Sequence, residues 1–192
     1  MAVDFRDEAP AILKDYLIYK QTIKNMSKKT VDEYFIDLRT FFRFLKVMRG
    51  LVPDGTDFDE IKIDDVDLDL IKTVNLELAY DYMNFLYRDR NNKSASRARK
   101  CSSLKGFFKY ITNNKHLLDT NPVEQLESPK NKKALPKYLT LEQSIELLNA
   151  VDGSNKQRDY CILTLFLNCG LRVSEMAGLN YNDIHSDGTM RV

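Results

Sequence analysis

Apolar residues recur every three or four positions along most of the chain, which is the spacing of amphipathic helices. In the first two thirds this pattern predicts four helices, over about 9–23, 27–48, 75–88 and 94–112. Ser27 stands where a helix N-cap belongs, and Gly50 with Pro53 ends the second helix. The predicted fold class is therefore mainly α.

The segment between the second and third helices has a different pattern. Over 54–69 apolar residues alternate with charged ones, but aspartate is a poor strand former. We expect a long surface connection with short extended or helical turns. Asn121 followed by Pro122 predicts a further short helix to about Leu126.

A proline- and lysine-rich segment over 128–137 is the best domain boundary in the chain. Beyond it, Thr140 and Gln143 form a capping box for a helix over about 141–150. An apolar helix over about 156–169 ends at Gly170, a short helix follows near 174–177, and Asp187-Gly188 is a hairpin-type turn signal. We predict a first domain over 1–128, a basic linker over 129–137 and a second region over 138–192. The second region, with its nearly all-apolar central helix, is expected to be only marginally stable alone.

Charge is segregated along the chain although the net charge is only +1. Residues 52–81 hold ten acids against two lysines, and residues 88–137 hold thirteen bases against four acids. Local charge sets the field at a binding face, so the basic segment favours a polyanion such as nucleic acid. A solvated helix face is the alternative that charge alone leaves open.

The predicted fourth helix carries this basic character on one side. Its apolar stripe consists of Cys101, Leu104, Phe108 and Ile111. The opposite side consists of Arg99, Ser102, Ser103, Gly106 and Lys109. Small residues beside bases let a helix backbone approach a phosphate chain closely.

The cysteines, the histidines and the lengths of the apolar runs argue against a disulfide-linked, membrane-spanning, secreted or metal-binding protein. Cys101, Cys161 and Cys169 form no C-x-x-C pair and lie in apolar helical contexts, so we expect reduced, buried thiols in a cytoplasmic protein. No apolar run approaches the roughly 20 residues of a membrane helix, and the N-terminus lacks signal-peptide features. His116 and His185 are expected to be ordinary surface residues, and we assign neither a metal nor a cofactor.

The segment 169–179 is the best candidate for chemistry. Arg172 follows a glycine break after the apolar helix, and Glu175 comes three residues later. An arginine at the seam between two helices is placed to reach an anionic ligand. The alternatives are a surface arginine that interacts with a helix dipole, and a glutamate favoured in the first turn of the next helix.

Three segments together resemble the tyrosine recombinase (phage integrase) superfamily, and Xer-type bacterial recombinases most closely. They are Met26-Ser27-Lys28-Lys29-Thr30 with Tyr34 and Leu38; Ser96-Arg97 through Phe108, followed by Asn121-Pro122 and Pro129 to Pro136; and Gly170-Leu171-Arg172-Val173-Ser174-Glu175. Each is weak alone, but their order and spacing cover nearly all 192 residues.

The resemblance implies a SAM-like core-binding domain of four to five helices and the truncated helical start of a catalytic domain, which together clamp double-stranded DNA. It implies that Arg172 binds the scissile phosphate and that Glu175 supports it. The family's later catalytic groups, including its nucleophile, match no position here, because Tyr138, Tyr160 and Tyr181 all come too early. These residues are therefore expected to bind DNA without recombining it, whereas the full-length protein would form tetramers on two DNA sites, possibly with a second recombinase.

The candidate DNA contacts follow from the same segments. They are Ser27, Lys28, Lys29, Thr30, Ser94, Ser96, Arg97, Arg99, Lys100, Ser103, Lys105, Lys132 and Lys133. Plain helix capping is the alternative for 27–30, and a merely soluble linker is the alternative for 132–133. Arg97 and Lys100 lie towards the apolar side of their helix, where long side chains can snorkel around its edge.

The implied function is site-specific recombination, either in chromosome dimer resolution or in DNA integration. Two alternatives remain from sequence alone. One is a non-catalytic DNA-binding regulator that uses the same clamp, and the other is a helical protein-interaction module, which would leave the basic segment unexplained.

Overall fold

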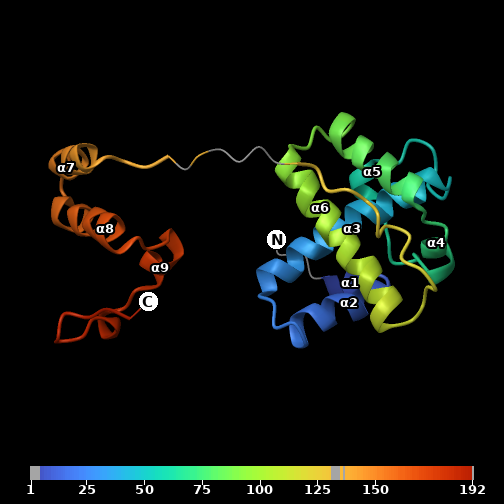
Figure 1. Cartoon of the computed structure of the whole chain (residues 1–192), viewed down its shortest axis with the longest axis horizontal. Helices are drawn as coiled ribbons and strands as arrows, with labels where there is room; N and C mark the ends of the chain where they lie inside the picture. The colour runs from blue at the N-terminus through green and yellow to red at the C-terminus, as the bar shows by residue number, and fades with distance from the viewer. Residues whose placement is uncertain (1–4, 131–134, 136, 192) are drawn as a thin grey trace. The chain divides into compact units, whose positions relative to one another are not determined.

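The computed structural model describes residues 5–130, 135 and 137–191. The chain divides into two compact units, residues 1–132 and 133–192 (Figure 1). In the described part of the chain, no helix combines the length and the apolar character that crossing a bilayer requires.

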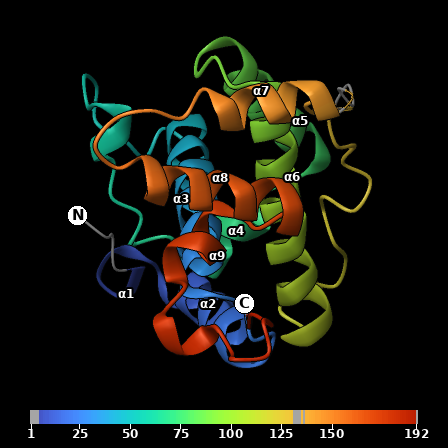
Figure 2. The ribbon, with the colours of Figure 1, turned by 90° about the vertical axis from the view of Figure 1, so that its left-hand side faces the viewer.

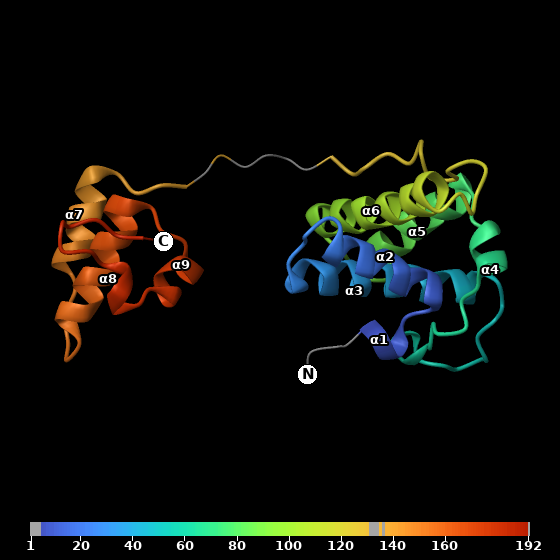
Figure 3. The ribbon, with the colours of Figure 1, turned by 90° about the horizontal axis from the view of Figure 1, so that it is seen from below.

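The first unit is a helical bundle, as predicted. Its helices are α1 (Phe5–Glu8), α2 (Ala11–Thr22), α3 (Lys28–Met48), α4 (Leu68–Lys72), α5 (Leu76–Arg88) and α6 (Ser94–Lys109), with a 3₁₀ turn at Phe58–Glu60 and a π-helical turn at Tyr110–Asn114. Figure 3 shows α6 lying along α3 and α5, with α4 at one end of the bundle. The four long helices confirm those predicted from apolar spacing.

The core of this unit is aromatic and lies mainly between α2, α3, α5 and α6. Its largest fully buried side chains include Tyr16, Phe35, Phe41, Phe42, Tyr82, Phe107 and Phe108. Many of these rings meet edge to face, as Phe42 and Phe107 do at 5.5 Å between centroids. Such tilted pairs are the favoured geometry for packed aromatic rings, and they fix how α6 seats against α3.

Local signals fix the ends of α3. The Ser27 side chain accepts a hydrogen bond from the Thr30 backbone N–H at 3.3 Å, which confirms the predicted N-cap. At the other end Gly50 has φ +64°, a left-handed conformation that glycine adopts without strain.

The acidic connection after α3 packs more closely than expected. Ile61, Ile63 and Val66 are buried, while the acids between them face outwards. Lys46 of α3 donates to the Asp65 carboxylate at 2.7 Å, and Arg43 donates to the Ile61 carbonyl at 2.9 Å. The alternation seen in the sequence therefore reflects a segment with one buried side, although it forms no strand.

The prediction of a short helix from Pro122 to about Leu126 is wrong. Residues 122–125 form a turn, in which the Asn121 side chain accepts from the Val123 N–H at 3.1 Å. The backbone bonds here span only three residues, such as Leu126 N–H to Val123 carbonyl at 3.1 Å. Val123 and Leu126 are buried and hold this turn against the bundle, and the four-residue hydrogen bonds of an α-helix do not form here.

The second unit contains α7 (Leu141–Asn149), α8 (Lys156–Cys169), α9 (Val173–Gly178) and a 3₁₀ turn at Tyr181–Asp183. Helices α7 and α8 lie side by side (Figure 2). The Thr140–Gln143 capping box and the left-handed Gly170 C-cap, with φ +62°, are confirmed. The Asp187-Gly188 turn is also present, beside an isolated antiparallel bridge between Ile184 and Met190.

Burial differs from the prediction for two of the three cysteines. Cys101 is buried, but Cys161 and Cys169 are exposed, and all three thiols are free. The apolar context of α8 suggested burial, but no described residue of the second unit is buried. An apolar sequence environment produces burial only where other elements cover it.

Candidate nucleic-acid interface

The N-terminal turn of α3 and one face of α6 line a common surface pocket. The pocket has a volume of about 330 Å³ and is lined by Lys29, Thr30, Glu33, Tyr34, Arg99, Ser102 and Ser103. Four of these are candidate DNA contacts, and they come from two segments about 70 residues apart in sequence. The structure therefore brings the two predicted groups together.

The start of α3 presents exposed polar groups. Besides capping the helix, the Ser27 hydroxyl lies 2.9 Å from the Thr30 hydroxyl. Lys28 and Lys29 are exposed, and Lys28 pairs with Asp32 at 3.0 Å. Both lysines can reach an anion here, where the helix dipole also favours negative charge.

The α6 side of the pocket is organised by an acid on α3. Asp37 is buried and forms ion pairs with Arg99 at 2.9 Å and Lys100 at 3.0 Å. The Ser103 hydroxyl donates to the same carboxylate at 2.8 Å. Arg99 also pairs with Glu33, and its side chain remains 43% exposed.

This arrangement corrects the assignment of Ser103 to the outward side of α6. Ser103 is only 3% exposed, and Lys100 is only 8% exposed. Both turn towards Asp37 because a buried carboxylate needs hydrogen-bond donors. For either to contact a phosphate directly, it would first have to leave this acid.

The other candidates on α6 are held in different ways. Ser94 and Ser96 are partly exposed in its first turn. The Arg97 guanidinium lies over the Tyr87 ring at 4.6 Å, which fits the expectation that it bends around the helix edge. Lys105 donates to the Leu126 carbonyl at 3.0 Å.

Gly106 has a packing reason for being small. A side-chain carbon at this position would lie 2.7 Å from the Tyr16 hydroxyl, so the glycine allows α2 to approach α6. Close packing within the bundle therefore explains this residue without a DNA contact. Lys132 and Lys133 lie outside the described residues.

Arg172 of the second unit lies between α8 and α9, as predicted. Its guanidinium donates to Glu175 at 2.7 Å, and its backbone N–H donates to the other oxygen of the same carboxylate at 2.7 Å. These two hydrogen bonds, the backbone one first, lower the pKa of Glu175. The Arg172 side chain is 81% exposed, so the glutamate holds the arginine at the surface.

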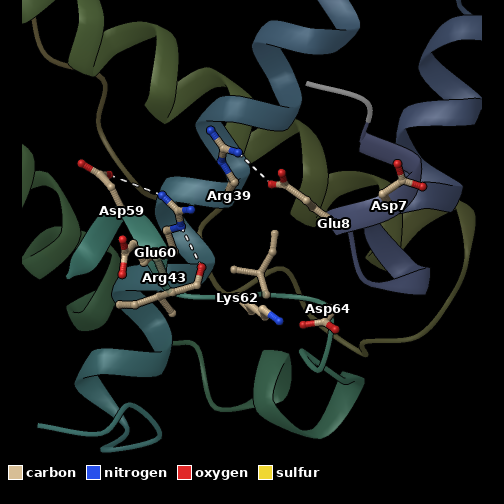
Figure 4. Close-up of a pocket in the computed structure, with 10 residues that line it drawn as sticks. Asp7, Glu8, Arg39, Arg43, Asp59, Glu60, Lys62 and Asp64 are labelled. Carbon is tan, nitrogen blue, oxygen red and sulfur yellow. Dashed lines mark hydrogen bonds and ion pairs between the residues drawn. The ribbon is translucent and has the colours of Figure 1, made fainter. Parts of the chain in front are cut away.

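A second pocket, of about 350 Å³, lies between α1, α3 and residues 59–64 (Figure 4). Both of its arginines are engaged: Arg39 pairs with Glu8 at 2.8 Å and Arg43 with Asp59 at 3.4 Å. Burial lowers the pKa of Arg43. Acids outnumber bases in its lining, which makes this pocket unsuited to a polyanion.

Glu33 and Asp37, the partners of α6, are not among the site residues predicted from sequence. A signal was present, because Asp37 is an acid beside Leu38 and between Tyr34 and Phe41 on the apolar side of α3. An acid at such a position needs a buried partner. Among the described residues, no three His, Cys, Asp or Glu side chains gather as a metal site would require.

Known protein families match both the helical bundle of the first unit and the second unit that carries Arg172. The N-terminal SAM-like domain of phage integrases matches residues 13–115, and the phage integrase family matches residues 137–192. The chain belongs to the phage integrase (tyrosine recombinase) family.

Curated relatives in this family are similar in sequence over most of the chain. The tyrosine recombinase XerC of Caldanaerobacter subterraneus subsp. tengcongensis is 49% identical over 93% of this chain and 50% of its own length. XerC of Syntrophus aciditrophicus is 31% identical over 94% of this chain and 55% of its own length, and XerD of Listeria monocytogenes is 28% identical over 91% and 53%. The chain thus spans about half the length of the curated relatives it matches. No solved structure matches it.

Family membership confirms the resemblance drawn from the three sequence segments. It also gives a common context to the two places where basic side chains are held at a surface, the α3–α6 pocket and the α8–α9 seam.

Proposed function

We propose that this chain binds duplex DNA in the cytoplasm as part of a site-specific tyrosine recombinase. The observation that carries the proposal is the pocket where Lys29 and Thr30 of α3 meet Arg99 of α6. Cations and hydroxyl groups from two helices converge there on one exposed surface, within a family of DNA recombinases. Binding to a phosphate backbone uses groups of this kind.

The direct contacts in this proposal are the exposed and partly exposed candidates. They are Ser27, Lys28, Lys29, Thr30, Ser94, Ser96, Arg97, Arg99 and Lys105. Lys132 and Lys133 of the linker are proposed to contact the DNA backbone. The proposed division is a core-binding domain over 1–128, a linker over 129–137 and part of a catalytic domain over 138–192.

For the whole protein we propose strand cleavage and rejoining through a 3′-phosphotyrosine, in chromosome dimer resolution or DNA integration. Arg172 would bind the scissile phosphate and Glu175 would hold it in place. A positioned donor of this kind stabilises charge that develops on the non-bridging oxygens. The whole protein would act as a tetramer on two DNA sites, alone or with a second recombinase, and these 192 residues alone would bind without cleaving.

Salt-dependent binding tests the DNA part of the proposal. The purified chain is titrated against a labelled mixed-sequence duplex over a range of salt concentrations, with fluorescence anisotropy as the readout. If several phosphates are contacted, the logarithm of the affinity falls steeply with the logarithm of salt. Lys29→Ala and Arg99→Ala should each weaken binding and reduce that slope by about one.

Lys72→Ala is the matched control. Lys72 is an exposed lysine on α4, within the acidic region, and its loss should leave the slope unchanged. A flat salt response of the unmodified chain, or equal effects of all three variants, would contradict the proposed interface. In the whole protein, Arg172→Ala should slow formation of the covalent protein–DNA adduct by about 10²–10³-fold; an unchanged rate would remove Arg172 from the active site.

A further inference from the structure

One buried carboxylate connects α3 to α6. The Asp37 side chain is 1% exposed. One of its oxygens pairs with Arg99 at 2.9 Å and with Lys100 at 3.0 Å, while the other accepts from Ser103 at 2.8 Å. Three donors from about one turn of α6 therefore converge on a single acid of α3.

This cluster is an expensive way to join two helices. Removing charges from water is unfavourable, and a buried ion pair is often no more stabilising than apolar side chains of the same volume. The surrounding core is aromatic and could have continued across this contact. What the charges add is a defined register, because Asp37 satisfies its donors only when α6 lies in one position along α3.

Arg99 carries the effect of this register to the surface. Its guanidinium is held from two sides, by Asp37 and by Glu33, one turn earlier on α3. The side chain is nevertheless 43% exposed and lines the same pocket as Lys29 and Thr30. A guanidinium has five N–H donors, so the two ion pairs leave others for a phosphate.

We propose that Asp37 is a positioning residue for DNA binding. It does not touch DNA; it holds Arg99, and the face of α6 that carries it, in register with the start of α3, so that both helices offer donors to one stretch of phosphate backbone. This inference rests on the proposed function and deepens it.

The sign of one substitution tests the proposal. Asp37→Asn removes a negative charge and would tighten binding to a polyanion if charge alone mattered. Positioning predicts the opposite: affinity for a mixed-sequence duplex falls about five- to tenfold at about 0.1–0.2 M salt, the factor associated with one phosphate contact. The slope against salt should also decrease by about one.

Asp69→Asn is the matched control for charge. Asp69 is an exposed acid on α4 that pairs only weakly, at 3.4 Å, with Lys72. Its substitution changes the net charge by the same amount, and binding should be unchanged or slightly tighter. If the folded Asp37→Asn variant binds the duplex as tightly as the unmodified chain, or more tightly, the inference is overturned.

A second background guards against loss of folding, because Asp37→Asn leaves the Lys100 ammonium buried without its anion. In a Lys100→Met background that ammonium is absent, and circular dichroism checks that each variant is folded. Adding Asp37→Asn to Lys100→Met should weaken binding by the same factor as in the unmodified chain. No further weakening in this background would also overturn the inference.

A double-mutant cycle tests whether Asp37 affects DNA binding through Arg99. If Asp37 acts through Arg99, Asp37→Asn should add nothing to Arg99→Ala, because both remove the same contact. Additive losses would mean that Asp37 acts by some other route, and would overturn the inference while leaving DNA binding intact. If instead the unmodified chain shows no salt-dependent binding, the proposed function itself fails.

Discussion

The two units of the chain hold their candidate phosphate-binding groups in different ways. In the first unit Arg99 is fixed by Asp37, 62 positions earlier in the chain and buried in the bundle. In the second unit Arg172 is fixed by Glu175, three residues away in the first turn of α9. One site depends on tertiary packing and the other on local backbone geometry.

Burial follows the same division. The first unit contains a continuous core with side chains such as Tyr16, Phe42 and Tyr82 fully buried. In residues 137–191 of the second unit no side chain is buried, and the apolar run 162–167 of α8 is only partly covered. The α3–α6 pocket of the first unit therefore depends on the stability of the whole bundle, whereas the geometry of Arg172 depends mainly on α9.

The largest test of this comparison removes a core ring. Phe42→Ala should lower the free energy of unfolding of the first unit by about 3–5 kcal/mol, because it loses a fully buried aromatic side chain and leaves a cavity. Urea unfolding followed by circular dichroism measures the change. Phe166→Ala in α8 removes the same side chain from a partly exposed position and should shift this transition by less than about 0.5 kcal/mol. Similar losses for the two variants would show that the units share one core.

Thiol reactivity compares the units without any substitution. Cys101 is buried and burial raises its pKa, whereas Cys161 and Cys169 are exposed. A thiol reagent such as DTNB should therefore modify two thiols rapidly and the third at least a hundredfold more slowly, since Cys101 must wait for opening of the bundle. Cys101→Ser should remove only the slow phase. Three equally fast thiols would contradict the difference in burial.

The parts of the fold that local signals determine are predictable from the sequence. Apolar periodicity gave the long helices, and the caps at Ser27, Thr140 and Gly170 were read from residue types at fixed spacing. Each depends on interactions within a few residues. The turn after Pro122 was misread because Val123 and Leu126 are drawn into the core by elements distant in sequence.

The candidate site shows the same limit. Charge and capping indicated the start of α3 and the face of α6 separately, but nothing in either segment reveals that they line one pocket. Ser103 was placed outwards because its own helix offers no reason to bury it; the reason is Asp37, 66 residues earlier. Exposure of Cys161 and Cys169 was missed for the converse reason, since an apolar helix needs neighbours to be buried.

Matched cap variants provide a finer comparison. Ser27→Ala removes the acceptor for the Thr30 N–H and should destabilise the first unit by about 1 kcal/mol, because α3 runs through its core. Thr140→Ala removes the corresponding acceptor for the Gln143 N–H in α7. It should reduce helicity by circular dichroism while leaving the urea midpoint of the first unit unchanged. A shift of that midpoint by Thr140→Ala would mean that α7 supports the bundle.

The smallest expected effect concerns the local contact between Glu175 and Arg172. Hydrogen bonds from Arg172 lower the pKa of this carboxyl, so the contact is complete above the unfolded-chain value, about 4.3, and is lost as pH falls through the lower folded value. Carbon NMR of the Glu175 carboxyl should therefore give a midpoint below the ordinary range. Since the backbone N–H has the largest effect, Arg172→Ala should move this midpoint only part of the way back. A full return would mean that the guanidinium, rather than the backbone of α9, holds the pair together, and an ordinary midpoint in the unmodified chain would mean that the contact does not form.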